Sequence, residues 1–248
     1  MMWMTNKKIL RFWLMVFFSL FALFVLLQVP AAWLLSKFYP NLRSLHNVSG
    51  NIWQGEADWS YQNLQGTLSW STRPWELLRL RAASNISIHS GQTEINAIAA
   101  YGLGKNVYLS AVNGEISSET LASVVDWQWP SSNIKLKDVS LKYKKQQGYQ
   151  DADGQLTWAG GLLNYPMGQR LERIDIPPLV GQLSAEKEQL KLAVQDGQKQ
   201  RMADLSLDKS NMLDVQITQR FLLNAPSYQG KAGMDTAVVS TRQPLGSL

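Results

Sequence analysis

The feature that most constrains this chain is an uncharged hydrophobic run near its N-terminus, from Phe12 to Val29. It holds 18 consecutive residues, of which 13 are Leu, Phe or Val. At about 1.5 Å per residue, a helix of this length spans about 27 Å, close to the roughly 30 Å thickness of a bilayer's hydrocarbon core. We therefore predict that residues 12–35 form a transmembrane anchor.

The charges around this run predict how the chain crosses the membrane. Lys7, Lys8 and Arg11 precede the run, and the first acidic residue is Glu56. Because the cytoplasmic flanks of membrane helices are enriched in Lys and Arg, residues 1–11 are expected to form a short cytoplasmic tail. The rest of the chain is then expected on the opposite side of the membrane.

A cleaved signal peptide is the alternative interpretation of the same run, with Ala31 and Ala32 as small residues near the cleavage point. The apolar segment of a signal peptide has about 7–15 residues, which is shorter than this run. The bulky residues Trp33, Leu34 and Leu35 also follow the two alanines. An uncleaved anchor is therefore the favoured interpretation.

The composition of the chain excludes several classes of function. Residues 1–35 hold three of the 24 basic residues and none of the 19 acidic ones, which leaves 21 basic against 19 acidic residues beyond the anchor. So small an excess of positive charge gives no reason to expect a nucleic-acid partner. The chain contains no cysteine, which excludes disulfides, thiolate metal sites and cysteine nucleophiles.

Sequence motifs for catalysis are also missing. The two histidines, His46 and His89, lack the spacing of a zinc-binding motif such as HExxH. The chain has neither the GxSxG motif of a hydrolase nor a glycine-rich nucleotide-binding loop. We therefore expect no catalytic residue, no cofactor and no metal site, and a protein that is not an enzyme.

Alternating apolar and polar residues predict the fold of the region after the anchor. In residues 52–59, Trp53, Ala57 and Trp59 share one parity, and polar residues occupy the other, as in a half-buried strand. Similar strand-like runs are found at 64–70, 85–89, 93–101, 106–115, 139–143, 154–158, 179–184, 189–196, 203–207, 212–218 and 236–241. We therefore predict a mainly β fold, in which a single transmembrane helix is followed by an antiparallel β-domain with short helices.

Two short helices are expected between these strands. Pro74 suits the start of a helix, and an acidic residue and then a basic residue follow it. Trp75, Leu77 and Leu78 are expected to form the buried stripe of this helix. Residues 118–125 predict a second short helix with a serine cap.

The order of these patterns divides the chain into segments. The expected segments are a cytoplasmic tail (1–11), an anchor (12–35), a juxtamembrane connector (36–46), a first β unit (47–126), a second β unit (127–241) and a C-terminal tail (242–248). The sequence GTLSW at 66–70 recurs as GQLTW at 154–158, which favours two related units. Chance recurrence of a strand pattern is the alternative explanation.

Two surface features are candidates for contact with other molecules. Trp127 and Trp129 lie between the predicted units and are expected to be exposed, which suits a protein contact. The lysines of residues 135–145 are interpreted as the solvent side of a strand. An acidic partner or a lipid head group is the alternative explanation for these lysines.

Three segments carry a resemblance to a known family: VSGNIWQGEADW (48–59), LQGTLSWSTRPWELL (64–78) and VVSTRQPL (238–245). Their most specific elements are a G-x-I-W-x-G motif (Gly50, Ile52, Trp53, Gly55) and an L-x-W-x-x-R-P motif (Leu68, Trp70, Arg73, Pro74). Over nearly its whole length, the chain resembles the type II secretion system protein N family.

This resemblance implies an accessory subunit of the bacterial inner membrane that supports the export of folded periplasmic proteins across the outer membrane. Such a subunit is not an enzyme, and its periplasmic β-domain contacts other type II secretion subunits. The eight motif residues would have structural roles in turns, close packing and a helix start. The alternative function is a membrane-anchored β-domain that binds or transfers lipid or another hydrophobic ligand. The identity of the partner subunits and the oligomeric state are left open.

Overall fold

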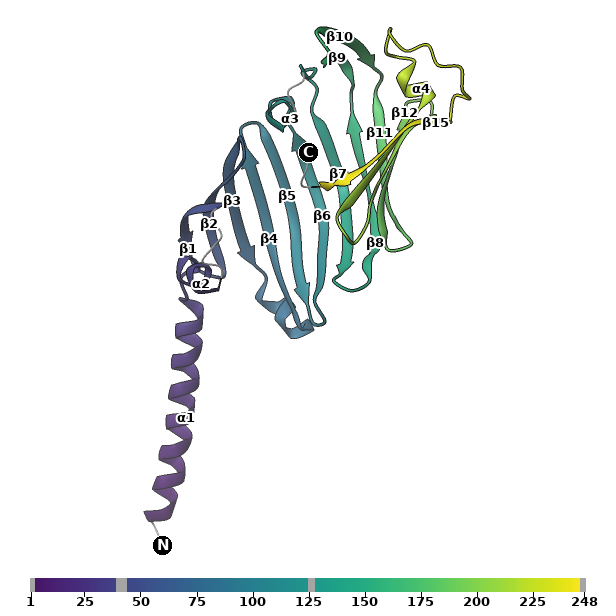
Figure 1. Ribbon diagram of the computed structural model, residues 1–248. Helices are drawn as coiled ribbons and strands as arrows, with labels where there is room; N and C mark the ends of the chain where they lie inside the picture. The colour runs from purple at the N-terminus through teal and green to yellow at the C-terminus, as the bar shows by residue number, and fades with distance from the viewer. Residues whose placement is uncertain (1–2, 39–43, 125–127, 246–248) are drawn as a thin grey trace.

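The computed structural model describes residues 3–38, 44–124 and 128–245, and it consists of an N-terminal helix attached to a large β-sheet (Figure 1). Helix α1 (Trp3–Leu27) includes a 19-residue apolar stretch, Ile9–Leu27, none of which is buried in the protein. This helix is long and apolar enough to cross a membrane. It begins within the predicted cytoplasmic tail. It ends shortly before Pro30, because a proline disfavours the helical conformation of the residue that precedes it. A short helix, α2 (Ala31–Phe38), follows the proline.

The β-domain is built on one 13-stranded antiparallel sheet, in which almost every strand pairs with the next strand in the sequence. Its strands, in spatial order, are β1 (Leu45–Gly50), β2 (Gln54–Tyr61), β3 (Leu64–Thr72), β4 (Arg81–Ser90), β5 (Thr93–Gly102), β6 (Asn106–Ile116), β7 (Ile134–Lys144), β8 (Gly148–Trp158), β11 (Leu179–Glu186), β12 (Gln189–Asp196), β13 (Arg201–Leu207), β14 (Met212–Thr218) and β15 (Ala237–Pro244). A separate hairpin of β9 (Gly161–Met167) and β10 (Arg170–Ile176) interrupts the series between β8 and β11. The predicted mainly β, antiparallel fold is confirmed.

One face of this sheet is apolar from β2 to β14. Directly opposed residues of an antiparallel pair lie on the same face, so the register can be followed from strand to strand. Trp70 opposes Ile86, and further along the sheet Leu136 opposes Leu156 and Leu183 opposes Leu192. The opposite face carries mainly polar and charged side chains. The sheet twists strongly, so that β15 runs across the direction of β5 (Figure 1).

Small elements cover the apolar face at the end of the sheet farthest from α1. Helix α3 (Ser118–Val124) lies over the start of β5, where the hydroxyls of Thr93, Ser117 and Thr120 form a hydrogen-bonded group. The hairpin β9–β10 and helix α4 (Gln219–Leu222) close the other half. Their buried residues are Leu163, Ile174, Ile176 and Ala225, and they pack against Trp129, Trp158, Tyr165, Leu179, Phe221 and Tyr228.

The sheet continues across the predicted boundary at residue 127, because β6 and β7 pair along most of their lengths. The two predicted units therefore share one sheet, and their division stays a prediction. The repeated pentapeptides end at Trp70 in β3 and Trp158 in β8, which lie on the same face but run in opposite directions, five strands apart. Since the strands progress in one direction through the sheet, a rotation that superposed these two strands would reverse the order of their neighbours. A shift along the sheet therefore does not relate the two pentapeptides, and the relation between the two units stays a prediction.

The predicted helix after Pro74 exists as a 3₁₀ helix, η1 (Pro74–Arg79), but the predicted burial of its apolar side chains is wrong. Trp75, Leu77 and Leu78 are 63%, 46% and 88% exposed. In a 3₁₀ helix, residues three apart lie on one face, so Trp75 and Leu78 point the same way. This helix connects the end of β3 to the start of β4, and its apolar side chains extend beyond the sheet. Helix α3 forms as predicted, with the hydroxyl of Ser117 accepting the amide hydrogen of Thr120 at 3.2 Å.

Candidate functional site at the anchor–domain junction

The motif residues lie on β1 to β3 and the segments that flank them, and most surround the point where α1 meets the sheet. The turn between β1 and β2, residues 51–53, contacts the last turn of α1 and the chain that follows it. Residues Gly50 and Gly55 flank this turn, and Trp70 and Arg73 lie at the end of β3 beside it. We call this group of contacts the junction.

Two hydrogen bonds attach the domain to the end of α1. The indole Nε1 of Trp53 donates to the carbonyl oxygen of Leu26 at 3.1 Å, and the amide of Ile52 donates to that of Val29 at 3.1 Å. The last four carbonyls of a helix lack partners within the helix, so Trp53 satisfies one that would otherwise be free. A bridge between Pro30 and Asn51 continues this pairing. The G-x-I-W-x-G motif thus holds the end of the anchor against the sheet.

Asn51 organises the turn that presents these donors. Its side-chain oxygen accepts the amide hydrogens of Trp53 and Gln54, both at 2.9 Å. Its backbone carbonyl accepts the indole N–H of Trp70 at 3.1 Å. Asn51 was not singled out from the sequence, although a side chain that bonds to its own backbone two residues on is a common turn signal.

Both motif glycines are required by the backbone at this turn. Gly50 has φ = +85°, which favours glycine, and a Cβ there would lie 2.4 Å from the oxygen of Gln54. A Cβ on Gly55 would lie 2.4 Å from the carbonyl oxygen of Ser49 and 2.4 Å from the ring of Trp70. The ring of Trp70 therefore packs directly on the backbone of the opposed strand.

Hydrogen bonds from the second motif join the end of β3 to β4, next to the junction. The amide of Arg73 donates to the carbonyl of Ala83 at 2.8 Å, and its Nε donates to Oδ1 of Asn85 at 3.0 Å. Pro74 begins η1. Leu68 lies apart from these contacts, on the apolar face between Ala57 and Ile88. Seven of the eight motif residues thus surround the junction or lie next to it, and Leu68 belongs to the sheet core.

A comparison with known protein families identifies the family to which the β-domain belongs. The family model described as type II secretion system (T2SS), protein N, matches residues 41–239, which span the β-domain from its first strand into β15. The chain belongs to the type II secretion system protein N family. Neither the search of curated proteins nor that of solved structures gave a match.

Membership of the type II secretion system protein N family associates the chain with type II secretion. The family is an accessory component of the inner-membrane complex of this system and is generally not an enzyme, and it is associated with other secretion components. The single N-terminal apolar helix agrees with this setting. The match gives no support to the alternative of a lipid- or ligand-carrying domain.

The tryptophan pair between the predicted units has a different setting from the one expected. Trp127 lies outside the described residues. Trp129 is half-buried, and its ring centroid lies 5.8 Å from that of Trp158, within the cluster that closes the far end of the sheet. Trp129 is therefore not exposed as predicted.

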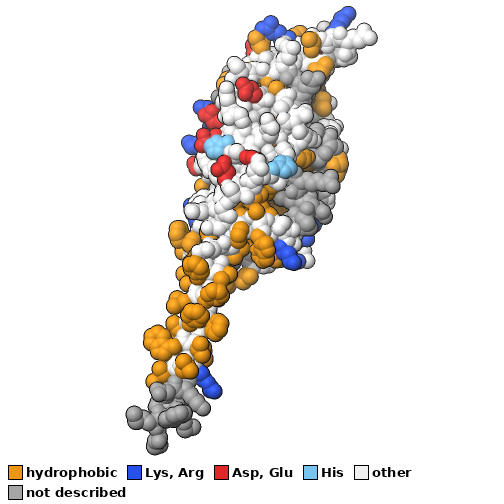
Figure 2. Space-filling model, turned by 90° about the vertical axis from the view of Figure 1, so that its left-hand side faces the viewer, with side chains coloured by type: hydrophobic (Ala, Val, Ile, Leu, Met, Phe, Trp, Pro, Cys, Tyr) orange, Lys and Arg blue, Asp and Glu red, His pale blue; other side chains and the backbone are white. Residues whose placement is uncertain are grey.

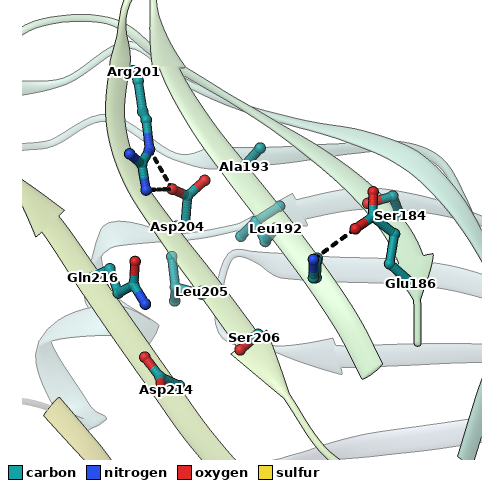
Figure 3. A pocket seen from close by; sticks show the side chains of 11 residues that line it. Ser184, Glu186, Leu192, Ala193, Arg201, Asp204, Leu205, Ser206, Asp214 and Gln216 are labelled. Atoms are coloured by element: carbon teal, nitrogen blue, oxygen red, sulfur yellow. Dashed lines mark hydrogen bonds and ion pairs between the residues drawn. The ribbon is translucent and has the colours of Figure 1, made fainter. Parts of the chain in front are cut away.

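A depression on the polar face of this family member crosses β11 to β14 (Figure 3). Four of its five charged side chains are paired: Lys191 Nζ lies 2.6 Å from Glu186 Oε2, and Arg201 pairs with Asp204. The fifth, Asp214, has a buried Oδ1 without a hydrogen-bond partner. The hydrogen bond from Lys191 lowers the pKa of the Glu186 carboxyl. Among the described residues that line the depression, the serines have no histidine beside them that could act as a base. The arrangement is that of a solvated polar face.

The lysines at 135–145 also lie mainly in polar surroundings. Lys135 forms an ion pair with Glu115 across β6 and β7 at 3.2 Å. A hydrogen bond from Asn133, together with this ion pair, lowers the pKa of the Glu115 carboxyl. Lys137 is exposed on the same face. Within the part of the chain that the structure describes, no group of three His, Asp or Glu side chains gathers as metal ligands.

Proposed function

We propose that this chain is a non-enzymatic inner-membrane accessory subunit of the type II secretion pathway, which contacts other secretion subunits through its periplasmic β-domain. The observation that carries the proposal is the junction. A subunit that only needed a tether would be served by a flexible linker, whereas Trp53 and Ile52 bind the end of α1 directly. The anchor and the sheet therefore hold a defined orientation, which suits a component that presents a surface to neighbours.

The proposed orientation places the N-terminus in the cytoplasm and the β-domain in the periplasm. Its support is the set of basic residues before the apolar run, Lys7, Lys8 and Arg11, together with the absence of acidic residues before Glu56.

The open edge of the sheet is the proposed contact surface. Strand β1 has α2 close beside it, whereas β15 pairs with β14 and has no second neighbour among the described strands. The outer edge of such a strand has backbone N–H and C=O groups that can pair with a strand of another protein. Most side chains of β15 are exposed. A partner strand could therefore extend the sheet beyond β15.

Photocrosslinking in cells tests this proposal. A photoreactive amino acid is placed at Ser240 and at Thr241, neighbours on β15 whose side chains point to opposite faces. We expect ultraviolet light to produce adducts that mass spectrometry identifies as secretion subunits. The matched control is Leu171, which is 67% exposed on β10, outside the 13-stranded sheet.

Adducts with secretion subunits from β15 but not from Leu171 would support both the function and the contact edge. Adducts from another exposed position, such as Lys137, would support the function and move the contact to the polar face. Absence of secretion subunits at every position, in cells that express the full chain and secrete normally, would contradict the proposed function.

A further inference from the structure

The largest group of exposed apolar side chains on the β-domain lies around η1. Leu78 and Leu80 are 88% and 64% exposed, and Trp75 is 63% exposed. Across from them, on the turn between β5 and β6, Leu103 is 68% exposed. Single exposed leucines are ordinary, but a contiguous group of this size marks a surface that meets another apolar phase.

Some of these side chains share one depression, and Trp75 and Leu78 lie on another face of the same short helix. Leu77, Leu80, Tyr101 and Leu103 line the same shallow depression, and η1 packs beside β4. Leu80 closes η1 in the left-handed conformation, φ = +57°, which a leucine seldom adopts. We call this surface, formed by Trp75, Leu77, Leu78, Leu80, Tyr101 and Leu103, the η1 patch.

The position of the η1 patch relative to α1 indicates what covers it. Figure 1 shows η1 and the adjoining β5–β6 turn at the lower end of the domain, level with the upper end of α1. Figure 2, turned by 90°, shows hydrophobic side chains continuing from the helix onto the lower part of the domain, with Lys and Arg beside them. Because the junction holds α1 against the sheet, this lower end faces the membrane that α1 is long enough to cross.

The charges around the η1 patch fit the surface of a bilayer. Arg81 and Lys105 border the patch, whereas Arg79 on η1 forms an ion pair with Glu76 at 3.2 Å. Lys144 and Lys145 lie on the next turn, which shares a second depression with Lys105. Arg81 also lies over the ring of Tyr108, 4.9 Å from its centroid. Lys and Arg near a membrane surface attract anionic head groups, and Trp and Tyr favour the interface between head groups and acyl chains.

We propose that the η1 patch is a second membrane contact, in which Trp75, Leu78 and Leu103 insert at the periplasmic surface of the membrane that α1 spans. The surrounding Arg and Lys side chains bind anionic head groups. The contact would fix the tilt of the sheet against the bilayer at two points, the end of α1 and η1. A protein partner or a second copy of the chain would suit the apolar side chains equally, but the basic border and the shared side with α1 favour the bilayer.

The absence of cysteine makes a direct test possible with the full chain in lipid nanodiscs. Leu78→Cys and Leu103→Cys are each labelled with a polarity-sensitive fluorophore, and quenching by lipids with a nitroxide on the acyl chain is measured. We expect blue-shifted emission at both positions and strong quenching. Leu171→Cys, about as exposed as Leu103 but at the far end of the domain, is the matched control and should show neither effect.

A fourth variant, Leu20→Cys within α1, separates failure of the anchor from failure of the patch. Quenching at position 20 without quenching at 78 and 103 would overturn the proposed contact and leave the anchor intact. The nanodisc contains no other secretion subunit, so a patch that serves such a partner would give that same negative result. Addition of anionic lipid should increase the quenching at 78, and added salt should reverse the increase. An unchanged signal would overturn the role of the basic border.

Discussion

Gly55 is the residue at which the junction is most sensitive to a single methyl group. A Cβ there would meet the backbone oxygen of Ser49 and the ring of Trp70, both at 2.4 Å. We expect Gly55→Ala to lower the free energy of unfolding by about 1–3 kcal/mol, as an overpacked site does. Urea unfolding of the full chain in detergent would measure this loss.

The matched control for Gly55 is Gly197→Ala, since a Cβ at Gly197 meets nothing within 4 Å. It should change the stability by less than about 0.5 kcal/mol. Equal effects of the two substitutions would mean that Trp70 does not pack on Gly55 as described.

Asp208 makes the turn between β13 and β14 sensitive to acid. The amide of Met212, at 3.0 Å, is the main donor that lowers the pKa of this carboxyl, and the amide of Ser210 and the side chain of Arg242 add to the effect. Because the pKa is lower in the folded state, the charged carboxylate stabilises the fold above its unfolded-state pKa. That stabilisation is lost as the pH falls through the folded-state value.

Amide hydrogen exchange can detect this loss. Once corrected for the intrinsic rates, exchange at Ser210 and Met212 should become faster below the ordinary pH range of an aspartate. The β5–β6 turn, where the side chain of Asn106 bonds to the carbonyl of Leu103, is the internal control and should not change in the same way. An Asp208→Asn variant that kept the full acid response would show that another group is responsible.

Among the elements, the β9–β10 hairpin contributes three of the four buried residues of the hydrophobic cluster that closes the far end of the sheet. Ile174 is 4% exposed and packs in the cluster with Leu163 and Trp158, whereas Leu171 on the same strand is 67% exposed. We expect Ile174→Ala to destabilise the protein by about 2–5 kcal/mol, through lost burial and the cavity left behind. Denaturant unfolding monitored by tryptophan fluorescence would measure this effect.

The control in the same hairpin is Leu171→Ala, which should stay within about 0.5 kcal/mol of the parent. If both substitutions were equally mild, the hairpin would not be closing the end of the sheet.

The strands were predictable because their signal is local. The alternation of Ala57 and Trp59 with polar neighbours needs no knowledge of distant residues, although Trp53, which shares their parity, lies in the turn before β2. The β9–β10 hairpin was missed, although Leu163 and Tyr165 alternate, because a proline and glycines interrupt its short runs. The burial of η1 was misjudged for a different reason: an apolar stripe on a helix shows that a partner is needed, but not whether that partner is part of the protein.

The junction could not be predicted, because it depends on contacts between distant parts of the chain. The sequence indicates that Gly50, Trp53 and Gly55 form a motif, but the bond from Trp53 to Leu26 joins residues 27 positions apart. Only the folded sheet brings its first turn to the end of α1. For the same reason, Asn51 gave no signal beyond that of an ordinary turn residue.

For the molecule as a whole, the direction in which it crosses the membrane can be tested with the same cysteine-free chain. In cells whose outer membrane is permeabilised and whose inner membrane is intact, a membrane-impermeant maleimide should label Leu171→Cys. Thr5→Cys, beside the basic residues that predict a cytoplasmic end, should react only after the inner membrane is opened. Labelling in the opposite pattern would reverse the proposed orientation.

The order of strands in the sheet has a consequence for how the protein is made. Nearly every strand pairs with the one synthesised just before it, from β1 beside the anchor to β15 at the far edge. In the proposed orientation, the β-domain follows α1 across the membrane with β1 first, so it can add strands one at a time, each onto an edge that is already formed. Such local pairing has a low loop-closure cost and favours rapid assembly. Strand β15 is the last of the described strands to be added, and its own outer edge stays open.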